Sequence, residues 1–521
     1  MPPKAWTRAC SPLCITRVEC GLDRPRLLDR AAVGGDGFAM LDLRPVGYII
    51  GLIVAVLGAT MLIPMVVDWQ IGDAQAGLFF RCAAFTIMSG GVLALTCANG
   101  LSGALTIRQA YVLTTGTWVL VPLFGCLPFW LAGAGTSFTD SYFEAVSGIT
   151  TTGSTIFVGL ETMSPGILLW RGLLNWLGGL GIVIVALIFL PMMRVGGMQF
   201  FRAEGFDTLG KIRPRLVDIA RSLLAVYLGL TVMATLILMT LGLSGLEASV
   251  HAMASIATGG FSTRDGSLTE FGPAVHYAIA GFMILGSLPY IRFVQLFNNL
   301  PGPLWRDKQV RAYLAIIAGA VLVVTVWRIV AAGIAVEPAF RLSLVNLTSV
   351  ISGTGFFAGP FESWGAFGVM VAFAIGFIGG CTASSSGALS VFRVQVMFAA
   401  IRSQIAKIHS PNSIQKIRYD GREVGQDVMD QVMLYTGGYF ATVIVLTLLM
   451  TLTGVDGTSA LFAIWTSVGN IGFGMGAVVA RTGTMLDFPE AAKWLMILAM
   501  LMGRLGLLAI LAILTARFWH H

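Results

Sequence analysis

The sequence predicts an all-α integral membrane protein in which four helix–pore-loop–helix repeats surround a central pore, after two extra N-terminal transmembrane helices. Three observations predict this fold: the composition, a set of apolar runs of spanning length, and glycine-rich segments that recur at similar intervals. Of the 521 residues, 56% are apolar and 11% carry charge, whereas about 25% of residues are charged in soluble proteins. This composition excludes a soluble enzyme, a nucleic-acid-binding protein and a disordered chain.

Residues 1–39 differ from the rest of the chain. They are basic and contain no continuous apolar run of the kind that a secretory signal needs. We expect this segment to be disordered or to reflect an upstream mis-start, with Met40 opening the membrane-embedded part. The seven cysteines have spacings that match no metal site, so we predict neither a disulfide nor a structural metal.

Ten apolar runs are long enough to cross a bilayer, because about 20 helical residues span its hydrocarbon core. They lie at 46–67, 78–98, 111–133, 170–193, 219–243, 272–297, 312–335, 365–402, 430–453 and 492–516. An even number of crossings puts both termini on one side of the membrane.

Lys and Arg concentrate in the connections on one side. Fourteen of them lie in the segments 194–218, 298–311 and 393–429. The opposite connections, 134–169, 244–271, 336–364 and 454–491, hold only Arg264, Arg341 and Arg481. The positive-inside rule therefore predicts cytoplasmic termini. These basic connections account for the net charge of +7 without a nucleic-acid partner.

Each of the four outer connections contains a short apolar stretch, of about twelve residues, that ends in glycine and other small residues. Such stretches are too short to span and indicate re-entrant helices. The glycines Gly153, Gly260, Gly355 and Gly472 are 107, 95 and 117 residues apart. The chain therefore contains a fourfold repeat. The expected units are the extension 1–39, the two extra helices 40–110, and the pore repeats 111–215, 216–305, 306–420 and 421–521.

Four short helices that re-enter from one face can converge on one axis. Their C-terminal ends carry partial negative charge, and glycine lets the following backbone bring its carbonyl groups close to an ion. Rings of carbonyls replace the water shell of the cation in potassium-channel filters. We therefore predict a cation pore, because irregular backbone at membrane depth must line a cavity or be buried in protein. Close helix packing at small residues would explain one such loop, but not four at matching positions.

At these loops the sequence resembles the Trk/Ktr/HKT superfamily of potassium transporters, most closely its bacterial TrkH branch, over residues 40–517. Further markers are Trp170-Arg171, the stretches Asn175 to Gly181 and Gly197 to Glu204, and Arg213-Pro214-Arg215. The resemblance implies a potassium-transporting homodimer in the bacterial inner membrane, joined by a peripheral cytoplasmic nucleotide-binding ring of the TrkA type. In this family, glycine at all four filter positions accompanies a preference for potassium.

The candidate selectivity filter comprises the residues at the ends of the four short helices. They are Thr151, Thr152, Gly153, Thr258, Gly259, Gly260, Thr354, Gly355, Asn470, Ile471 and Gly472. We expect potassium at the backbone carbonyls of Thr152, Thr258, Thr354 and Ile471. Acidic residues near these loops are few (Asp140, Glu144, Asp265 and Glu270), which disfavours a carboxylate ring that selects divalent ions.

The eighth apolar run is interrupted by nine small residues. They are Gly379, Gly380, Cys381, Thr382, Ala383, Ser384, Ser385, Ser386 and Gly387. This composition predicts a hinge or an unwound loop inside the membrane, and the matching segment of the family is a loop that obstructs the pore. A contact between closely packed helices is the alternative. The family usually ends this loop with a lysine, where this chain has Ser390.

Arg504 lies deep in the last apolar run, where a charge costs about 2.5–3.5 kcal/mol on insertion scales. We expect it to face a watery cavity as part of the gate, since the family's matching arginine is a positive barrier below the filter. The alternative is a packed arginine that binds carbonyl groups. Arg171, Arg292 and Arg328 are nearer the ends of their runs and are expected to snorkel toward the interface.

The chain contains neither a Walker motif nor a strand–glycine–helix unit. We therefore expect it to be no enzyme and to bind no nucleotide itself; nucleotide control would act through a soluble partner on the basic connections. A sodium-conducting or ion-coupled symporter relative is the nearer alternative function. A secondary transporter of organic solutes with inverted repeats is disfavoured, because all four glycine loops enter from one face.

Overall fold

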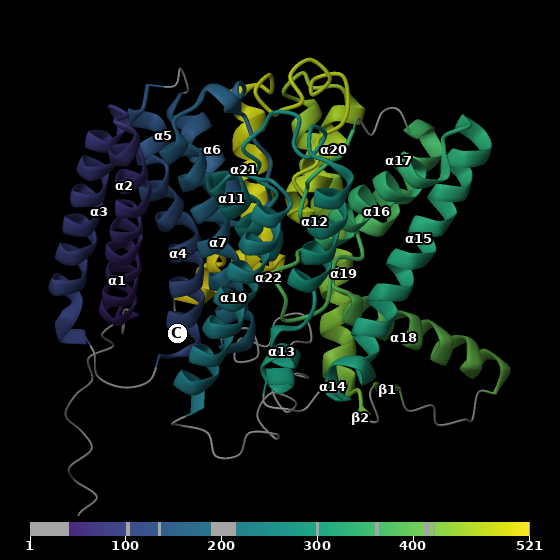
Figure 1. Ribbon diagram of the computed structural model, residues 1–521. Coiled ribbons are helices and arrows are strands. Elements are labelled where there is room, and N and C mark those ends of the chain that lie inside the picture. Colours follow the sequence, from purple (N-terminus) through teal and green to yellow (C-terminus); the bar gives the residue numbers. More distant parts are fainter. Residues whose placement is uncertain are drawn as a thin grey trace, which may run out of the picture.

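The computed structural model describes residues 41–100, 105–133, 137–188, 215–297, 302–359, 364–410, 417–419 and 422–519. Over these residues the protein is a bundle of helices with one small two-stranded hairpin (Figure 1). The expectations for residues 1–39, and for most of the basic connection 194–218, lie outside the described residues.

The N-terminal segment forms two long, closely packed arms. α1 (Arg44–Thr60) runs into α2 (Leu62–Ile71), and the chain returns as α3 (Gln75–Cys97). Gly51 and Gly90 face each other where α1 meets α3, and a Cβ on either would lie within 3.0 Å of the other's carbonyl oxygen. Glycine therefore permits the close backbone contact through which helices associate in a bilayer.

The rest of the bundle alternates long helices with short ones. In chain order the elements are η1 (Ala98–Gly100), α4 (Ile107–Gly125), α5 (Leu127–Leu131), α6 (Phe138–Ile149), η2 (Leu160–Thr162), α7 (Pro165–Ile188), α10 (Arg215–Thr240), α11 (Gly245–Ile256), α12 (Pro273–Gly286), α13 (Tyr290–Phe297), α14 (Gly302–Arg306), α15 (Lys308–Ala332), α16 (Val336–Ser352), α17 (Gly365–Gly376), α18 (Val391–His409), β1 (Arg418–Tyr419), β2 (Arg422–Glu423), α19 (Gln426–Thr451), α20 (Gly457–Gly469), α21 (Glu490–Leu505), α22 (Leu507–Leu514) and α23 (Ala516–Trp519). The short helices α6, α11, α16 and α20 each pack on the helices that precede and follow them.

Seven helices or directly joined pairs in the described part of the chain are long and apolar enough to cross a membrane. They are α1–α2, α3, α4–α5, α7, α10, α15 and α19. The protein is therefore an all-α, multi-pass membrane protein, as predicted. The other three predicted runs, 272–297, 365–402 and 492–516, are each broken.

The run 272–297 was expected to be one span, and this expectation is wrong in its geometry. α12 and α13 meet at an angle of 94°, next to Pro289, which lacks the backbone N–H that a continuous helix needs. The interrupted segment 379–387 binds the backbone groups freed at this bend. Cys381 N–H donates to Ser287 O at 3.1 Å, and Tyr290 N–H donates to Ala383 O at 3.2 Å.

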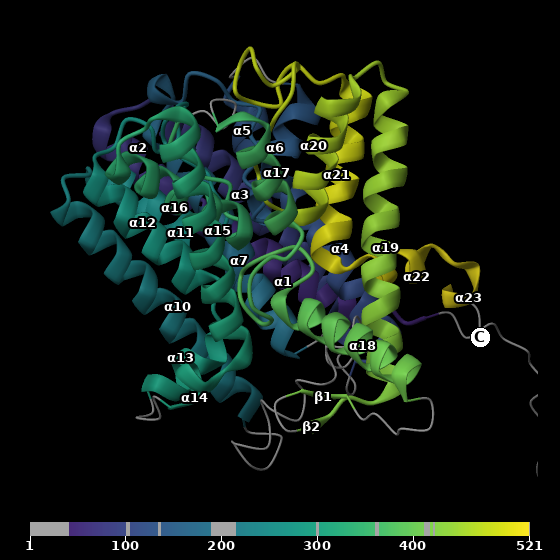
Figure 2. The ribbon, with the colours of Figure 1, turned by 90° about the vertical axis from the view of Figure 1, so that its right-hand side faces the viewer.

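The run 492–516 is also shorter as a helix than expected. α21 stops at Leu505, Gly506 has a φ of 81°, and α22 then leaves in a new direction (Figure 2). The run 365–402 is interrupted as predicted, since α17 ends at Gly376 and α18 begins at Val391. Every break coincides with glycine or proline, the residues that least favour a continuous helix.

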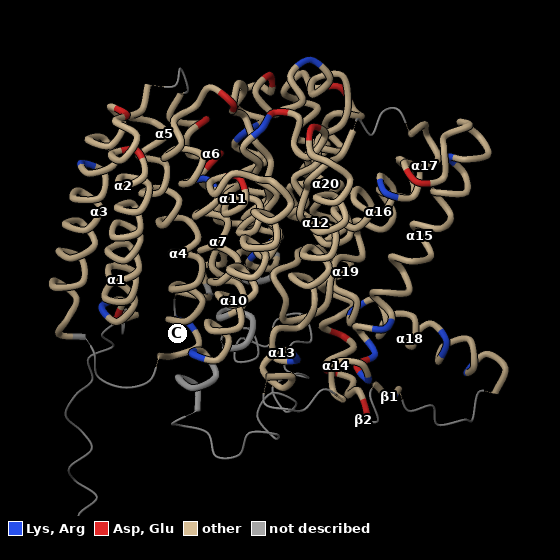
Figure 3. Tube along the Cα trace, viewed as in Figure 1, with Lys and Arg blue, Asp and Glu red and all other residues tan. Residues whose placement is uncertain are grey.

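The two ends of the bundle differ in charge. In the orientation of Figure 1, the short helices and the loops that follow them occupy the upper half. Lys and Arg residues, blue on the Cα trace, lie at the lower end around α13, α14 and α18 (Figure 3). Below, "upper" and "lower" refer to this orientation.

A buried carboxylate joins the N-terminal helices to the rest of the bundle. Asp68 of α2 is 0% exposed. It accepts hydrogen bonds from the Ser164 hydroxyl at 2.9 Å and from the Gly166 N–H at 2.6 Å. Because these donors lie at the start of α7, Asp68 caps a helix that follows it by about a hundred residues in the chain.

Replacing Asp68 with Ala should lower the stability of the protein by about 1–2 kcal/mol, the usual cost of removing a helix cap. The melting temperature of the purified protein in detergent measures this loss. Asp430→Ala is the matched control, because Asp430 is an exposed carboxylate on α19. Equal melting temperatures for the two variants would contradict the capping role.

Candidate functional site

Three of the four short helices have N-terminal side-chain caps at their upper ends. Ser137 and Ser244 form capping boxes with Asp140 and Glu247, and the Asp456 side chain caps α20. These side chains satisfy backbone N–H groups that a first helical turn leaves unpaired. The local sequence therefore fixes where α6, α11 and α20 begin, while α16 starts without a side-chain cap.

All four short helices end in the same hydrogen-bond pattern. In each helix the residue that follows the first left-handed residue (Thr151, Thr258, Gly353 or Asn470) donates its N–H to the carbonyl five residues before it. These bonds join Thr152 to Ser147 at 2.9 Å, Gly259 to Ala254 at 2.8 Å, Thr354 to Ser349 at 2.9 Å, and Ile471 to Thr466 at 2.9 Å. This is the bond of the Schellman motif, which closes a helix through a left-handed residue. The chain thus leaves each helix by an equivalent turn.

Each loop contains two left-handed residues, which are separated by one residue. The φ values are 51° and 83° at Thr151 and Gly153, 51° and 71° at Thr258 and Gly260, 71° and 88° at Gly353 and Gly355, and 50° and 88° at Asn470 and Gly472. Threonine is β-branched and disfavours this conformation, at a cost of about 1–3 kcal/mol. The strained Thr151 and Thr258 therefore require surroundings that hold the loops in place, and strain of this kind clusters at functional sites.

The four loops contact one another in a closed ring. Each ring glycine lies against a carbonyl of the next loop in chain order, and the fourth loop returns to the first. The contacts join Gly153 to the Gly259 carbonyl, Gly260 to that of Thr354, Gly355 to that of Ile471, and Gly472 to that of Thr152. A Cβ on any of these glycines would lie within 3.0 Å of that oxygen. Lack of space and positive φ together restrict these positions to glycine.

One carbonyl of each loop occupies an equivalent place in the ring, namely those of Thr152, Gly259, Thr354 and Ile471. In the second loop this carbonyl belongs to Gly259, one residue after the Thr258 expected from the sequence. Thr258 instead corresponds to Thr151, as the first left-handed residue of its loop. The structure brings all the predicted filter residues into these four loops and adds Gly353, which the sequence reasoning omitted.

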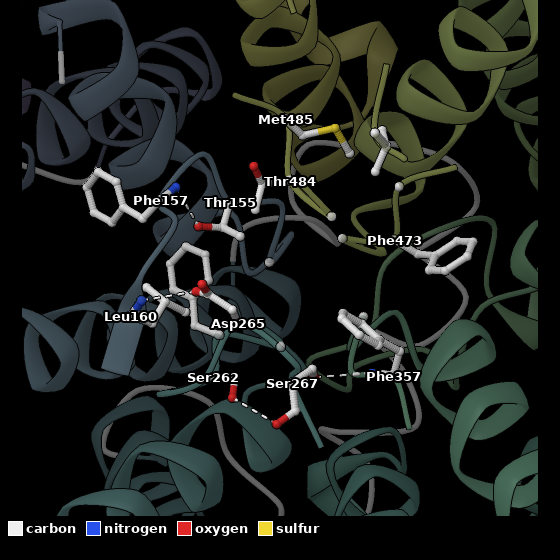
Figure 4. A pocket seen from close by; sticks show the side chains of 18 of the residues that line it. Thr155, Phe157, Leu160, Ser262, Asp265, Ser267, Phe357, Phe473, Thr484 and Met485 are labelled. Atoms are coloured by element: carbon white, nitrogen blue, oxygen red, sulfur yellow. Dashed lines mark hydrogen bonds between the residues drawn. The ribbon is translucent and has the colours of Figure 1, made fainter. Parts of the chain in front are cut away.

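A cavity of about 220 Å³ adjoins the ring, with the four ring glycines in its lining (Figure 4). Aromatic rings of Phe357 and Phe473 and the side chain of Thr155 also line it. Asp265 contributes a carboxylate to the lining, but its oxygens accept the N–H groups of Gly159 at 2.7 Å and Leu160 at 3.0 Å. Among the described residues, the lining therefore contains no ring of carboxylates.

The positive charge of Arg264, in the same lining, is balanced locally. Arg264 forms ion pairs with Glu247, at 2.7 Å, and with Glu270. Hydrogen bonds to these two carboxylates raise the pKa of Arg264 above its ordinary value. The cavity wall thus presents a neutralised cluster rather than a free cation.

A buried ion pair supports the first two loops from behind. Arg171 and Glu144 are 1% and 0% exposed, with Nε and Oε1 2.8 Å apart. Arg171 also donates to the Ser262 carbonyl at 2.7 Å and to the Thr155 hydroxyl at 3.0 Å, and Glu144 accepts the Ile156 N–H at 3.0 Å. The pair therefore joins the chain just beyond the first ring glycine to the chain just beyond the second.

The expectation that three arginines near span ends snorkel is wrong. Arg171 is buried in the pair described above. Arg328, 4% exposed, lies over the Trp364 ring at 4.7 Å from its centroid. Arg292 pairs with Asp307 at 2.8 Å. Each guanidinium has an internal partner, which its position in an apolar run does not reveal.

The segment 379–387 lies directly against the ring loops. Gly387 packs on the Gly469 carbonyl so closely that a Cβ would come within 3.0 Å of it, and Gly353 also faces Gly387. The Ser385 hydroxyl is 3.1 Å from the Tyr290 hydroxyl of the bent α12–α13 pair. The small residues of this segment thus let it fit between the ends of two short helices and the bend.

Arg504 connects this segment to the first loop. Its Nη2 atom donates to the Thr151 hydroxyl and to the Ser385 carbonyl. Both partners are neutral, and no carboxylate pairs with Arg504 within the described ranges. An uncompensated positive charge therefore stands between the first loop and the 379–387 segment.

Sequence reasoning missed three supporting residues. Glu144 was noted only as a nearby acid, Asn175 only as the start of a stretch shared with the family, and Tyr290 was not identified. Asn175 is buried beside Gly259, and within the described part of the chain its amide has no hydrogen-bond partner. The available signal was an amide in the apolar run 170–193, since polar groups at membrane depth are costly unless they serve a purpose.

The chain is similar to several known proteins. Residues 77–520 match the TrkH family, described as cation transport proteins. The chain is 35% identical to a Trk system potassium uptake protein, TrkI, of Halomonas elongata, over 91% of this chain and 96% of the relative. It is 32% identical to TrkH of Escherichia coli K12, over 92% of this chain and 100% of the relative. The crystal structure of the potassium transporter TrkH from Vibrio parahaemolyticus is similar with a TM-score of 0.85 and 27% identity, covering 92% of this chain and 100% of that one.

Removing one member of the buried pair should cost far more than removing one member of an exposed pair. Arg171→Gln should destabilise the protein by about 3–5 kcal/mol, because it leaves the Glu144 carboxylate buried and uncompensated. Arg481→Gln breaks the exposed Arg481–Asp487 pair and should leave the melting temperature in detergent nearly unchanged. Similar melting temperatures for the two variants would show that the pair does not support the loops.

Proposed function

The chain belongs to the TrkH family of cation transport proteins, and on that premise we propose that it is the ion-translocating membrane subunit of a Trk-type potassium uptake system. Two relatives of similar length are named as potassium uptake proteins. The observation that carries the proposal is the closed ring of four glycine loops, each at the end of a short helix. The chain is a transporter and not an enzyme.

In this proposal the ring is the selectivity filter. The carbonyls of Thr152, Gly259, Thr354 and Ile471 replace the water shell of a potassium ion as it crosses. Potassium releases its water more readily than sodium does, so a ring of carbonyls serves it better, whether cavity size or field strength dominates. The negative ends of the four short helices add a favourable potential for a cation.

The lining of the neighbouring cavity is further evidence that the transported cation is monovalent. Its one lining carboxylate, Asp265, is occupied by two backbone N–H groups. An ion arriving there meets neutral oxygens of the ring rather than a set of free carboxylates. This favours potassium over a divalent ion, for which protein sites usually supply carboxylates.

The gate in this proposal is the segment 379–387 together with Arg504. The segment lies against the ring at Gly353 and Gly469, where it would block an ion that leaves the filter. Arg504 adds a positive charge and ties the Ser385 carbonyl to the first loop. Opening requires the loop to leave these contacts, and its small side chains form few packing contacts that resist such a movement.

Membership of the TrkH family also leads to a proposal for the oligomeric state, the membrane orientation and the partner of the subunit. We propose a homodimer in the bacterial inner membrane, with both termini and the Lys- and Arg-rich lower end in the cytoplasm. A nucleotide-binding ring of the TrkA type would dock on this lower end, while the chain itself binds no nucleotide. The proposed pore repeats are 111–215, 216–305, 306–420 and 421–521.

Gly153→Ser should raise sodium permeation relative to potassium. The serine Cβ has no space beside the Gly259 carbonyl, so the first loop must shift and turn one carbonyl away from the ring. The measurement is competition by sodium against rubidium uptake in liposomes that contain the purified protein.

Gly159→Ser is the matched control for Gly153→Ser. Gly159 lies in the same connection and also has a positive φ, 77°, but a Cβ there would be 3.4 Å from its nearest neighbour, the Thr162 hydroxyl. Its sodium-to-rubidium ratio should equal that of the wild type. If Gly153→Ser shows that same ratio while folded, the first loop is not part of the filter.

Arg504→Gln should raise rubidium flux several-fold without changing the preference for potassium over sodium. Glutamine keeps hydrogen-bond donors but removes the positive charge, which opposes a cation in a low-dielectric passage. Flux into liposomes measures the effect, and Arg328→Gln is the control for loss of a guanidinium elsewhere in the bundle. Unchanged flux in a folded variant would make Arg504 a packing residue, and a collapsed ion preference would make it part of the filter.

A further inference from the structure

An apolar cavity of about 500 Å³ lies between the N-terminal helices and the first pore repeat. α1 and α4 line it on one side, and α7 and the last residue of α6, Ile149, line it on the other. Gly181 of α7 borders this space, and a Cβ there would have no atom within 4 Å. Leu52 and Val56 of α1 also line the cavity and are 45% and 61% exposed, so it opens to the outside of the bundle.

The lining does not suit water. Thr114 and Thr117 contribute the only hydroxyls among the lining residues, and each donates to a carbonyl of its own helix, at 2.8 Å. Apart from the indole of Trp118, the other lining side chains are aliphatic or absent. A water molecule needs two to four polar partners to remain in a cavity. Hydrocarbon is therefore the chemically matched occupant at this depth.

Positive charge stands at the lower end of the same two helices. Arg44 begins α1 and Arg108 lies in the first turn of α4, each five residues before the first cavity residue of its helix. Five helical residues correspond to about 7.5 Å. The Gln109 amide donates to the Asp42 carbonyl at 2.7 Å, which holds the two helix starts together. The Asp42 carboxylate accepts the Arg44 backbone N–H at 3.0 Å. The two helix starts therefore carry two arginines, Arg44 and Arg108, and one acidic residue, Asp42.

We propose that the cavity binds one acyl chain of an anionic phospholipid, whose phosphate lies at Arg44 and Arg108. The cavity volume of about 500 Å³ leaves room for hydrocarbon beside α1 and α4. The glycerol backbone covers the distance between the charged groups and the apolar space. Along α1 and α4, an arginine is thus followed by apolar residues, just as the phosphate of a phospholipid is followed by its acyl chains.

The bound chain would support the filter from behind. Ile149 ends the first short helix, and Gly178 of α7 packs so closely on the Ile149 carbonyl that a Cβ would lie within 3.0 Å. Both residues line the cavity. The acyl chain would therefore fill the space behind the helix that precedes Thr151 and Gly153.

Retention of lipid tests the proposal independently of transport. The full-length protein is loaded with phosphatidylglycerol or phosphatidylcholine, isolated in detergent, and analysed by native mass spectrometry. Wild type should retain one phosphatidylglycerol per chain, several-fold more than phosphatidylcholine. Gly181→Leu, which fills the cavity, should lose it at least five-fold. Gly319→Leu is the matched control, since Gly319 also lies in a long helix with no atom within 4 Å of a Cβ, and it should retain lipid as wild type does.

Two results would overturn the proposal in this experiment. One is retention by Gly181→Leu equal to that of the wild type, which would put the lipid elsewhere. The other is equal retention of both lipids by the wild type, which would remove the role of Arg44 and Arg108. The double variant Arg44→Gln/Arg108→Gln should make retention of the two lipids equal.

Fluorescence gives a second test that needs no cavity-filling variant. Trp118 lines the cavity and is 6% exposed, so an acyl chain inside the cavity would lie near its ring. Phosphatidylglycerol brominated on its acyl chains should quench its emission in liposomes, and Trp118→Phe should remove that quenched component. If Trp118→Phe leaves the quenched fraction unchanged, the cavity is empty or filled by the chain itself, and the proposal is wrong.

Discussion

The close approach of four backbone loops governs how the surrounding helices are arranged. No Cβ fits at the ring glycines, and two threonines adopt a left-handed conformation that they disfavour. Such loops persist only under support from several sides. The Thr152 hydroxyl receives the Asn470 amide at 2.9 Å and lies 2.7 Å from the Thr150 hydroxyl, while Arg171 and Glu144 hold the first two loops from behind. Side-chain caps fix where three of the four short helices begin.

The broken helices next to the ring contain backbone groups that no helix pairs. Backbone groups at membrane depth must be paired within the protein. The bend between α12 and α13 and the segment 379–387 leave such groups free, and they pair with one another. A loop held by hydrogen bonds and glycine contacts, rather than by large apolar side chains, can detach at lower cost. The same features that let the segment fit against the ring therefore suit it to be a gate.

The sequence predicted the membrane fold, the four short helices and the residues of the ring, because hydrophobic length and glycine position are local signals. It also located the break at 379–387. It did not predict the bend at Pro289 or the turn at Gly506, because the hydrophobicity of an apolar run is the same whether its helix is straight or broken. It misassigned Arg171, Arg292 and Arg328, whose partners Glu144, Asp307 and Trp364 are brought near by folding. The shift from Thr258 to Gly259 depended on backbone dihedral angles, which residue types do not specify.

Anomalous diffraction from crystals of the protein grown in rubidium locates the transported ion without any substitution. We expect an anomalous peak inside the ring, coordinated by the carbonyls of Thr152, Gly259, Thr354 and Ile471, and a loss of that peak when sodium replaces rubidium. An occupied rubidium site elsewhere in the bundle, with no peak inside the ring, would show that the four loops do not form the filter.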